Sequence, residues 1–180
     1  MTYDTDKLTK TIKDHGFDKV GILNTDALVF MPEVRAMCAA DKCRNYNKSW
    51  SCPPACGTLA DSQNTVRGYT FGMIFETVGN MEDEFDYETI SETSAKHSKN
   101  TVKLISDLKK EYPDIVGMSA GTCRICEKCA YPDAPCRHDD IRLISMEAYG
   151  LFVSDVCKKS GMPYNNGPLT TTFISCFLLK

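Results

Sequence analysis

The chain has 180 residues, 42% of them hydrophobic, and this length suits one hydrophobic core, so we expect residues 1–180 to form a single domain. A formal net charge of -3 argues against a protein that coats nucleic acid or anionic membrane, because both tasks need a basic surface. The polar first ten residues lack an apolar signal segment and no apolar run approaches membrane-spanning length, so we expect a cytoplasmic protein.

Periodicity and turn residues predict four strands and three helices. The helices are marked by apolar side chains at three- and four-residue spacing between capping residues and a closing glycine or proline. The strands are short runs rich in apolar and aromatic residues. In chain order we predict a helix at 5–16, strands at 17–23 and 69–78, a helix at 90–112, a strand at 115–120, a helix at 139–159 and a strand at 170–179.

The last predicted helix takes Asp139 or Asp140 as its N-cap and Gly161 as its end, with Ile144 and Val156 on its buried stripe. Alternation of strand and helix in the second half of the chain favours parallel crossover connections. We therefore expect an α/β or α+β fold. It is a single-domain sandwich with a roughly four-stranded mixed sheet, helices packed on it and two cysteine-rich cluster loops.

The chain contains ten cysteines. The reducing cytosol disfavours disulfides, so metal binding is the leading use for these thiols. Residues 36–64 carry four of them with little periodicity and two adjacent prolines, which predicts a loop shaped around a ligand. Eight of the ten fall into two groups: Cys38, Cys43, Cys52 and Cys56, and then Cys123, Cys126, Cys129 and Cys136.

The second group has its first three cysteines at successive three-residue steps, in GTCRICEKCAYPDAPCRHDD. This matches the start of the bacterial ferredoxin run C-x₂-C-x₂-C-x₃-C-P, although here six residues separate the third and fourth cysteines. A cubane takes three thiolates from one loop, whereas structural zinc usually recruits two separate Cys-x-x-Cys pairs. We predict a [4Fe-4S] cluster, with zinc as the alternative. Cys136 either completes this cluster or reaches the other site.

The first group, CAADKCRNYNKSWSCPPAC, has spacings that resemble no zinc or ferredoxin template. We predict a second [4Fe-4S] cluster here, with zinc again as the alternative. Trp50, beside Cys52, either shields a cluster from water or anchors the core. The segment is basic, which suits an anionic cofactor and a docking patch for an acidic redox partner or an anionic substrate, or else reflects ordinary surface charge. The basic residues are Arg35, Lys42, Arg44 and Lys48, against one acidic residue, Asp41.

Four motifs resemble an uncharacterised family of predicted metal-binding proteins, domain of unknown function 2284. They are KCRNYNKSWSCPP, AGTCRICEKCAYPDAPCR, SMEAYG and TFISCFLL, and they span the chain from about residue 35 to its end. The resemblance implies metal or iron-sulfur binding and supplies no reaction. It implies ligands at Cys38, Cys43 and Cys52 and leaves the fourth open. Without Cys56, one iron is open to substrate, or Cys157 or Cys176 takes its place; for these two we favour small buried hydrophobes.

Other chemistry has little support. No Walker A, GxGxxG or HExxH motif is present, so nucleotide chemistry has no anchor. His138 follows Cys136 closely and is either a ligand or catalytic group or a surface residue. Glu147 and Tyr149, on the last predicted helix, supply either an acid and a phenol beside a cluster or structural hydrogen bonds.

These patterns predict an iron-sulfur protein of an anaerobe or facultative anaerobe. It would hold two [4Fe-4S] clusters and pass electrons to a redox partner protein, with no nucleic-acid or membrane partner and with homo-oligomerisation left open. One alternative is an enzyme that uses an open-coordination iron as Lewis acid or sulfur-binding site. Another is a zinc-stabilised interaction module. Catalytic residues remain unassigned in each case.

Overall fold

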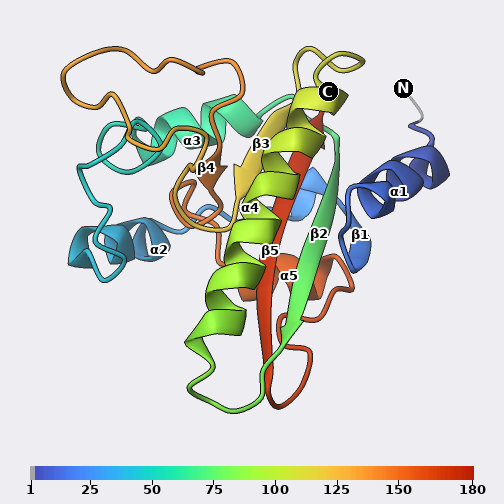
Figure 1. Cartoon of the computed structure of the whole chain (residues 1–180). Helices are drawn as coiled ribbons and strands as arrows, with labels where there is room; N and C mark the ends of the chain where they lie inside the picture. Colours follow the sequence, from blue (N-terminus) through green and yellow to red (C-terminus); the bar gives the residue numbers. More distant parts are fainter. Residues whose placement is uncertain (1–2) are drawn as a thin grey trace.

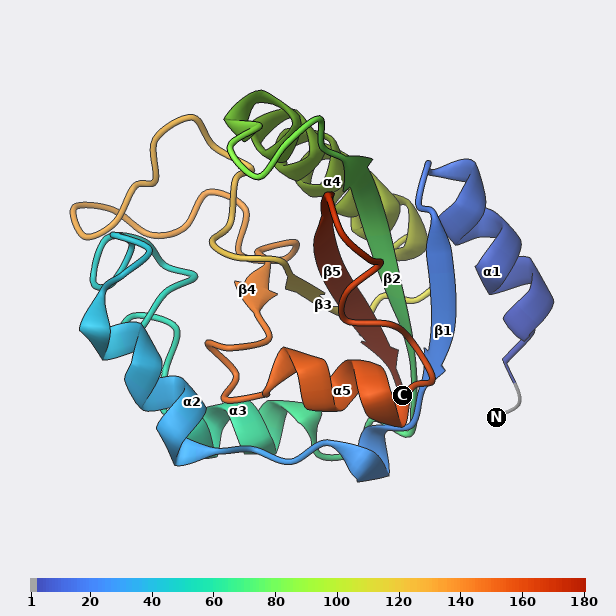
Figure 2. The same cartoon turned by 90° about the horizontal axis from the view of Figure 1, so that it is seen from below.

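The computed structural model describes residues 3–180, in which one mixed five-stranded sheet carries helices on both faces (Figures 1 and 2). The strand order is β1-β2-β5-β3-β4. Only β3 and β4 pair in parallel, and the other three pairs are antiparallel. The strands are β1 Lys19–Leu23, β2 Phe71–Asn80, β3 Val116–Ser119, β4 Ile144–Ser145 and β5 Thr170–Leu179.

Helices α1 (Thr5–Asp14) and α4 (Tyr87–Leu108) cover one face of the sheet (Figure 2). Their apolar stripes pack on the side chains of β2 and β5 that point to this face, including Phe75 and Phe177. The N-cap of α1 is Asp4, which accepts a 2.9 Å hydrogen bond from the backbone of Lys7. The residues that α1 and α4 contribute to this core are Leu8, Ile12, Leu104, Ile105 and Leu108.

The other face is covered by α3 (Leu59–Val66) and α5 (Val153–Lys159). Alternate residues of β5 point to this side, as the two-residue period of a strand requires. Helix α2 (Pro32–Met37) lies at the edge of this layer and runs into a 3₁₀ turn, Cys38–Ala40; another 3₁₀ turn is Thr25–Ala27. The core on this face includes Val66, Ile74, Val156, Cys157, Ile174, Cys176 and Leu178.

The expected sandwich of helices on a roughly four-stranded mixed sheet is confirmed as an α+β fold, and the strands differ from the prediction in two details. The sheet has a fifth strand, β4, whose two residues are too few to show a period in the sequence. Parallel connections run from β2 to β3 through α4 and from β3 to β4, but the last strand does not continue this pattern. Instead β5 inserts between β2 and β3 and runs antiparallel to both.

The helix predicted at 139–159 is also wrong, because only its last turns, α5, are helical. Gly150 has φ +83° and a side chain there would meet Leu59, so a helix cannot pass through it. Residues 146–150 instead form a turn, whose Gly150 carbonyl accepts a 2.7 Å backbone hydrogen bond from Met31, and Leu151 after it bridges to Phe30. Tertiary pairing with residues 30–31 overrides the helical periodicity.

The predicted loop at 36–64 is shorter than expected, because α3 begins at Leu59. Thr58 and Asp61 form a reciprocal capping box that fixes this start. Among the helices of residues 3–180, none combines the length and apolar character needed to span a bilayer.

Candidate metal site

The two cysteine groups lie on two loops that stand side by side beyond the β4 edge of the sheet (Figures 1 and 2). The first loop follows α2 and leads to α3, and the second connects β3 to β4. All ten cysteines are free thiols. The structure thus brings together two groups that are about 70 residues apart in the chain.

Hydroxyl side chains join the two loops at their closest approach. The backbone N–H of Cys123 donates to Ser51 Oγ across 3.1 Å, and Ser51 Oγ lies 3.2 Å from Thr122 Oγ1. Thr122 Oγ1 in turn lies 3.3 Å from Cys52 Sγ. Ser49 Oγ completes the cluster at 3.0 Å from Ser51 Oγ. Sequence reasoning missed these hydroxyls because nothing in either segment signals the other.

An outer clamp holds the loops together on the solvent side. The Trp50 indole N–H donates to the backbone carbonyl of Ala134 across 2.9 Å, and its ring meets the edge of Tyr131 at 5.0 Å between centroids. The Tyr131 hydroxyl donates to Asn47 across 2.5 Å. The Arg142 guanidinium donates to the Trp50 carbonyl across 2.9 Å. Trp50 therefore packs on the opposite loop.

The thiols differ in exposure in a way that separates ligand candidates from core residues. Cys43 is exposed, Cys52 is buried, and the other six in the two groups are intermediate. Cys157 and Cys176 are completely buried in the core between α5 and the sheet. Burial raises the pKa of Cys157 to about 11, with Glu76 adding to the shift, and burial raises that of Cys176 further. These two match the small buried hydrophobes expected for them.

Two thiols of the first loop, those of Cys38 and Cys56, interact electrostatically with other cysteines of the same loop. Burial raises the pKa of Cys38, the Arg35 guanidinium opposes this, and Cys43 and Cys52 add to the rise. Burial likewise raises the pKa of Cys56 against Arg35, with Cys52 adding to it. The raised pKa keeps the Cys38 and Cys56 thiols protonated at neutral pH without metal, so metal binding there would release protons.

Cys123 is the most constrained thiol of the second loop. Burial raises its pKa, the backbone N–H groups of Ile125 and Leu143 lower it by hydrogen bonding to the sulfur, and Cys136 and Cys126 raise it. Hydrogen bonds of this kind favour an anionic sulfur. Cys129 occupies the same loop and is half-buried.

Arg35 ties the first loop to the turn after β4. Its guanidinium donates to the carbonyls of Gly57 and Ala148 and hydrogen bonds to the Cys56 sulfur. The sequence indicated only a basic residue near the cysteines. Its role as a three-way tether comes from the fold.

The remaining candidates from the sequence are Glu147 and Tyr149, in the turn after β4, and His138, on the second loop. Glu147 and Tyr149 lie between β4 and α5 rather than on a helix. Glu147 is exposed and close enough to Cys38 to raise its pKa. Tyr149 is buried, and burial raises its pKa to about 12 against the influence of Arg142. His138 is half-buried, and its backbone carbonyl accepts from Ile141.

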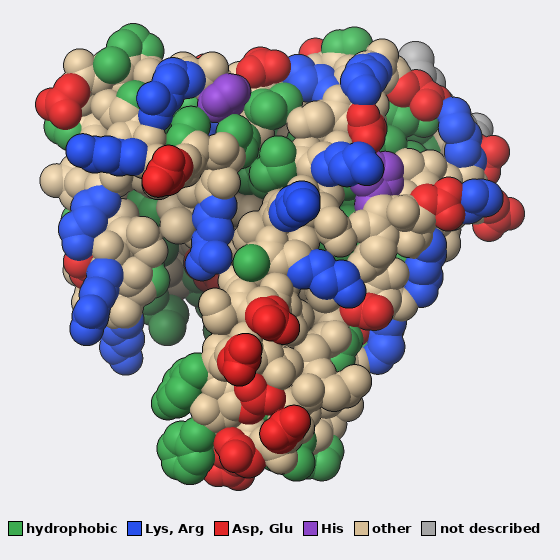
Figure 3. Space-filling view, viewed as in Figure 1, with side chains coloured by type: hydrophobic (Ala, Val, Ile, Leu, Met, Phe, Trp, Pro, Cys, Tyr) green, Lys and Arg blue, Asp and Glu red, His purple; other side chains and the backbone are tan. Residues whose placement is uncertain are grey.

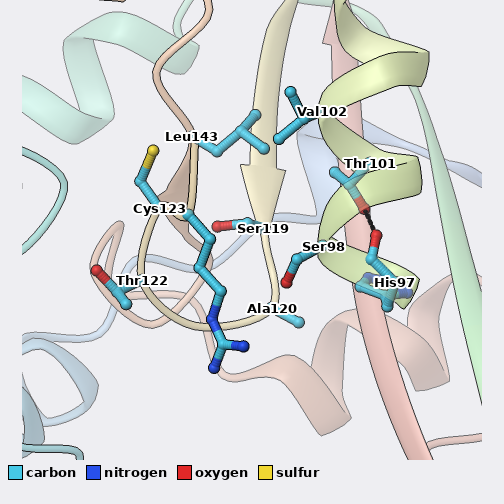
Figure 4. A pocket seen from close by; sticks show the side chains of 10 residues that line it. His97, Ser98, Thr101, Val102, Ser119, Ala120, Thr122, Cys123 and Leu143 are labelled. Atoms are coloured by element: carbon cyan, nitrogen blue, oxygen red, sulfur yellow. Dashed lines mark hydrogen bonds between the residues drawn. The ribbon is translucent and has the colours of Figure 1, made fainter. Parts of the chain in front are cut away.

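A series of hydrogen-bonded buried polar side chains connects α4 and the sheet to the start of the second loop. His97 on α4 lies between Thr77 Oγ1, 2.8 Å from Nδ1, and Ser175 Oγ, 2.7 Å from Nε2. Ser175 Oγ also accepts a 3.0 Å hydrogen bond from the backbone of Ala120, at the start of the loop. Burial lowers the pKa of His97 to about 3, so the imidazole is neutral. Figure 4 shows His97 on α4 opposite Ala120.

The donor set and its placement fit a polynuclear metal centre. Eight free thiols lie on two adjoining loops, and backbone N–H groups point at one of the sulfurs. Within residues 3–180, no three Cys, His, Asp or Glu side chains are gathered for a single metal ion.

Comparison with protein-family models gives one result for this chain. The model described as predicted metal-binding protein (DUF2284) matches residues 21–179, which include both loops and the entire sheet except the first two residues of β1. Comparisons with curated proteins and with solved structures gave no match. The chain therefore belongs to the DUF2284 family of predicted metal-binding proteins.

Proposed function

We propose that this protein binds two [4Fe-4S] clusters and passes electrons to a partner protein. The first cluster is held by Cys38, Cys43, Cys52 and Cys56, and the second by Cys123, Cys126, Cys129 and Cys136. The observation that carries the proposal is the placement of eight free thiols on two adjoining loops. A bound cluster supplies one-electron redox chemistry, and the loops hold it and limit its contact with water.

The spacing of the thiols supports iron-sulfur clusters over zinc. Tetrahedral zinc with Zn–S bonds of about 2.3 Å requires sulfurs only about 3.8 Å apart. In a cubane each iron takes its own thiolate, so the sulfurs stand farther apart. Cys123, Cys126 and Cys129, at successive three-residue steps on one loop, match the second arrangement, as in the ferredoxin run.

The surroundings of Cys123 support electron transfer over a reaction on a substrate. A hollow between α4 and the second loop lies beside Cys123, lined also by Ser98, Thr101, Ser119 and Leu143 (Figure 4). Its volume is about 10 Å³, which is about the space of one water molecule. Electron transfer needs no substrate cavity, because a partner only has to approach the cluster.

The charge distribution supports an acidic redox partner. Lys and Arg side chains gather over the cysteine loops and the outer side of α4, whereas Asp and Glu gather at the opposite end of α4 (Figure 3). This separation gives a basic face next to the clusters on a protein of net charge -3. The exposed basic residues of these segments are Lys42, Arg44, Lys48, Lys96, Lys99, Lys103, Arg124, Lys128 and Arg137.

Purification without oxygen tests the proposal directly. About eight irons and eight sulfides per chain, with negligible zinc and an EPR signal after dithionite reduction, are the expected result. A colourless protein with stoichiometric zinc would contradict it and favour an interaction module. Free thiols and clusters of this kind persist in a reducing, oxygen-poor cytoplasm, which is the setting we propose.

A further inference from the structure

We propose that Thr122 is a positioning residue whose hydroxyl sets the reduction potential of the neighbouring cluster, the one held by Cys52. This inference rests on the proposed function. Its distinctive feature is that Thr122 belongs to the second loop, beside Cys123, while the sulfur it contacts belongs to the first.

The contact is part of a three-link chain between ligands of different groups. The Cys123 N–H donates to Ser51 Oγ at 3.1 Å, Ser51 Oγ meets Thr122 Oγ1 at 3.2 Å, and Thr122 Oγ1 meets Cys52 Sγ at 3.3 Å. Figure 4 shows the Thr122 hydroxyl turned away from α4. Ser51 is 2% exposed and Cys52 8%, so water competes little for these bonds.

Metal ligation by Cys52 determines which groups donate and which accept along this chain of hydrogen bonds. In the metal-free protein the Cys52 thiol donates to Thr122 Oγ1. A ligating cysteine is a thiolate with no proton to donate, so the Thr122 O–H must turn and donate to the sulfur. Ser51 already accepts from Cys123, which leaves its own O–H to donate to Thr122 or Ser49. All donors can then point toward Cys52, and such chains strengthen each bond by polarisation.

A hydrogen bond to a cluster sulfur favours the reduced state, because reduction adds negative charge that the donor stabilises. Removing the Thr122 hydroxyl should therefore lower one of the two reduction potentials. The other potential should stay the same, since the sulfur of Cys123 takes its hydrogen bonds from the backbone of Ile125 and Leu143.

The test compares Thr122→Val, which keeps the side-chain shape, with Thr122→Ser, which keeps the hydroxyl. Both are purified without oxygen, iron and sulfide are quantified, and the potentials are measured by EPR-monitored titration. We expect a roughly tenfold shift in one reduction equilibrium for Thr122→Val, or about 59 mV more negative, and little change for Thr122→Ser. Pulsed EPR of reduced wild type in D₂O should show an exchangeable hydroxyl coupling that Thr122→Val lacks.

Iron content separates the two ways of failing. Wild type without iron and sulfide would overturn the proposed function and this inference with it. Full iron in Thr122→Val with unchanged potentials would overturn only the role of Thr122. If Thr122→Val does not hold iron, the shorter Thr122→Ala decides. A lowered potential in Thr122→Ala supports the inference, and loss of iron there as well overturns it in favour of a role in assembly.

Discussion

Trp50 and Ala134 belong to different cysteine loops, and the indole N–H of the first donates a 2.9 Å hydrogen bond to the carbonyl of the second. The Trp50 ring also packs edge-on against Tyr131. These side-chain contacts connect the two loops, which therefore act as one structural unit. Thr122 and Ser51 add a second connection beneath the clamp.

Trp50→Phe should weaken this unit. Phenylalanine keeps a ring beside Tyr131 but cannot donate to Ala134, so we expect a loss of about 1 kcal/mol in the free energy of unfolding. Urea unfolding under anaerobic conditions measures it. Trp50→Ala, which also removes the ring pair, should lose about 1 kcal/mol more. Equal stability of wild type and both variants would show that the clamp is not maintained in solution.

Arg35→Lys should destabilise the protein although the charge is kept. A lysine ammonium cannot reach the carbonyls of Gly57 and Ala148 together, so a planar fork of hydrogen bonds is lost. We expect a loss of about 1.5–3 kcal/mol, measured by urea unfolding. Arg67→Lys is the matched control, because Arg67 is exposed on α3's C-terminal cap and should tolerate lysine. Similar losses of unfolding free energy in Arg35→Lys and Arg67→Lys would show that the hydrogen bonds of Arg35 do not stabilise the fold.

His97 predicts a pH dependence of stability. The folded state keeps the imidazole neutral down to about pH 3, whereas the unfolded chain takes up a proton near pH 6.5. Between these values the unfolded state binds more protons, so stability falls as the pH falls, by about 1.4 kcal/mol per unit once below 6.5. Unfolding curves at pH 7.5 and 5.5 test this on wild type and His97→Gln. His97→Gln should lack the loss of stability that protonation of His97 causes. Equal losses of stability in wild type and variant between pH 7.5 and 5.5 would contradict a buried neutral imidazole at His97.

Cysteine variants should separate ligands from core residues. Cys126→Ser should reduce iron from about eight to about four per chain, because one cluster loses a thiolate. Cys176→Ala should keep full iron and lower only the stability, since Cys176 lies in the core. Metal analysis and urea unfolding of each variant provide the readouts. Iron loss in Cys176→Ala would place this thiol at a cluster instead.

Cys56→Ser distinguishes two forms of the first cluster. If all four thiolates ligate, the variant should lose iron from this site. An unchanged spectrum and iron content would instead support an open iron and the enzyme alternative.

Charge reversal on α4 should slow reduction by an acidic partner. Lys96 and Lys99 are exposed on the basic face, so Lys96→Glu/Lys99→Glu should reduce the rate with an acidic flavodoxin about tenfold at low salt. Stopped-flow kinetics across ionic strengths measure this, and salt should diminish the difference. Lys158→Glu on α5, across the sheet from α4, is the control. Equal rates for both variants would rule out this docking face.

The sequence by itself determined the local features of this protein. The two-residue and 3.6-residue periods located α1, α4, β1, β2, β3 and β5 to within a few residues, because these elements bury whole apolar faces. The cysteine spacings separated eight candidate ligands from Cys157 and Cys176. The motifs also indicated the family that the match over residues 21–179 confirms.

Only the tertiary structure decided how distant segments meet. Strand β5 lies between β2 and β3, and residues 30–31 pair with Gly150 and its neighbour, because these arrangements bury both faces of the sheet. A short stretch of sequence carries no information about such burial. The contacts of Ser51 with Thr122, Trp50 with Ala134 and Arg35 with Ala148 likewise join residues more than 70 positions apart. A sequence lists such donors and acceptors, but the packed chain selects their partners.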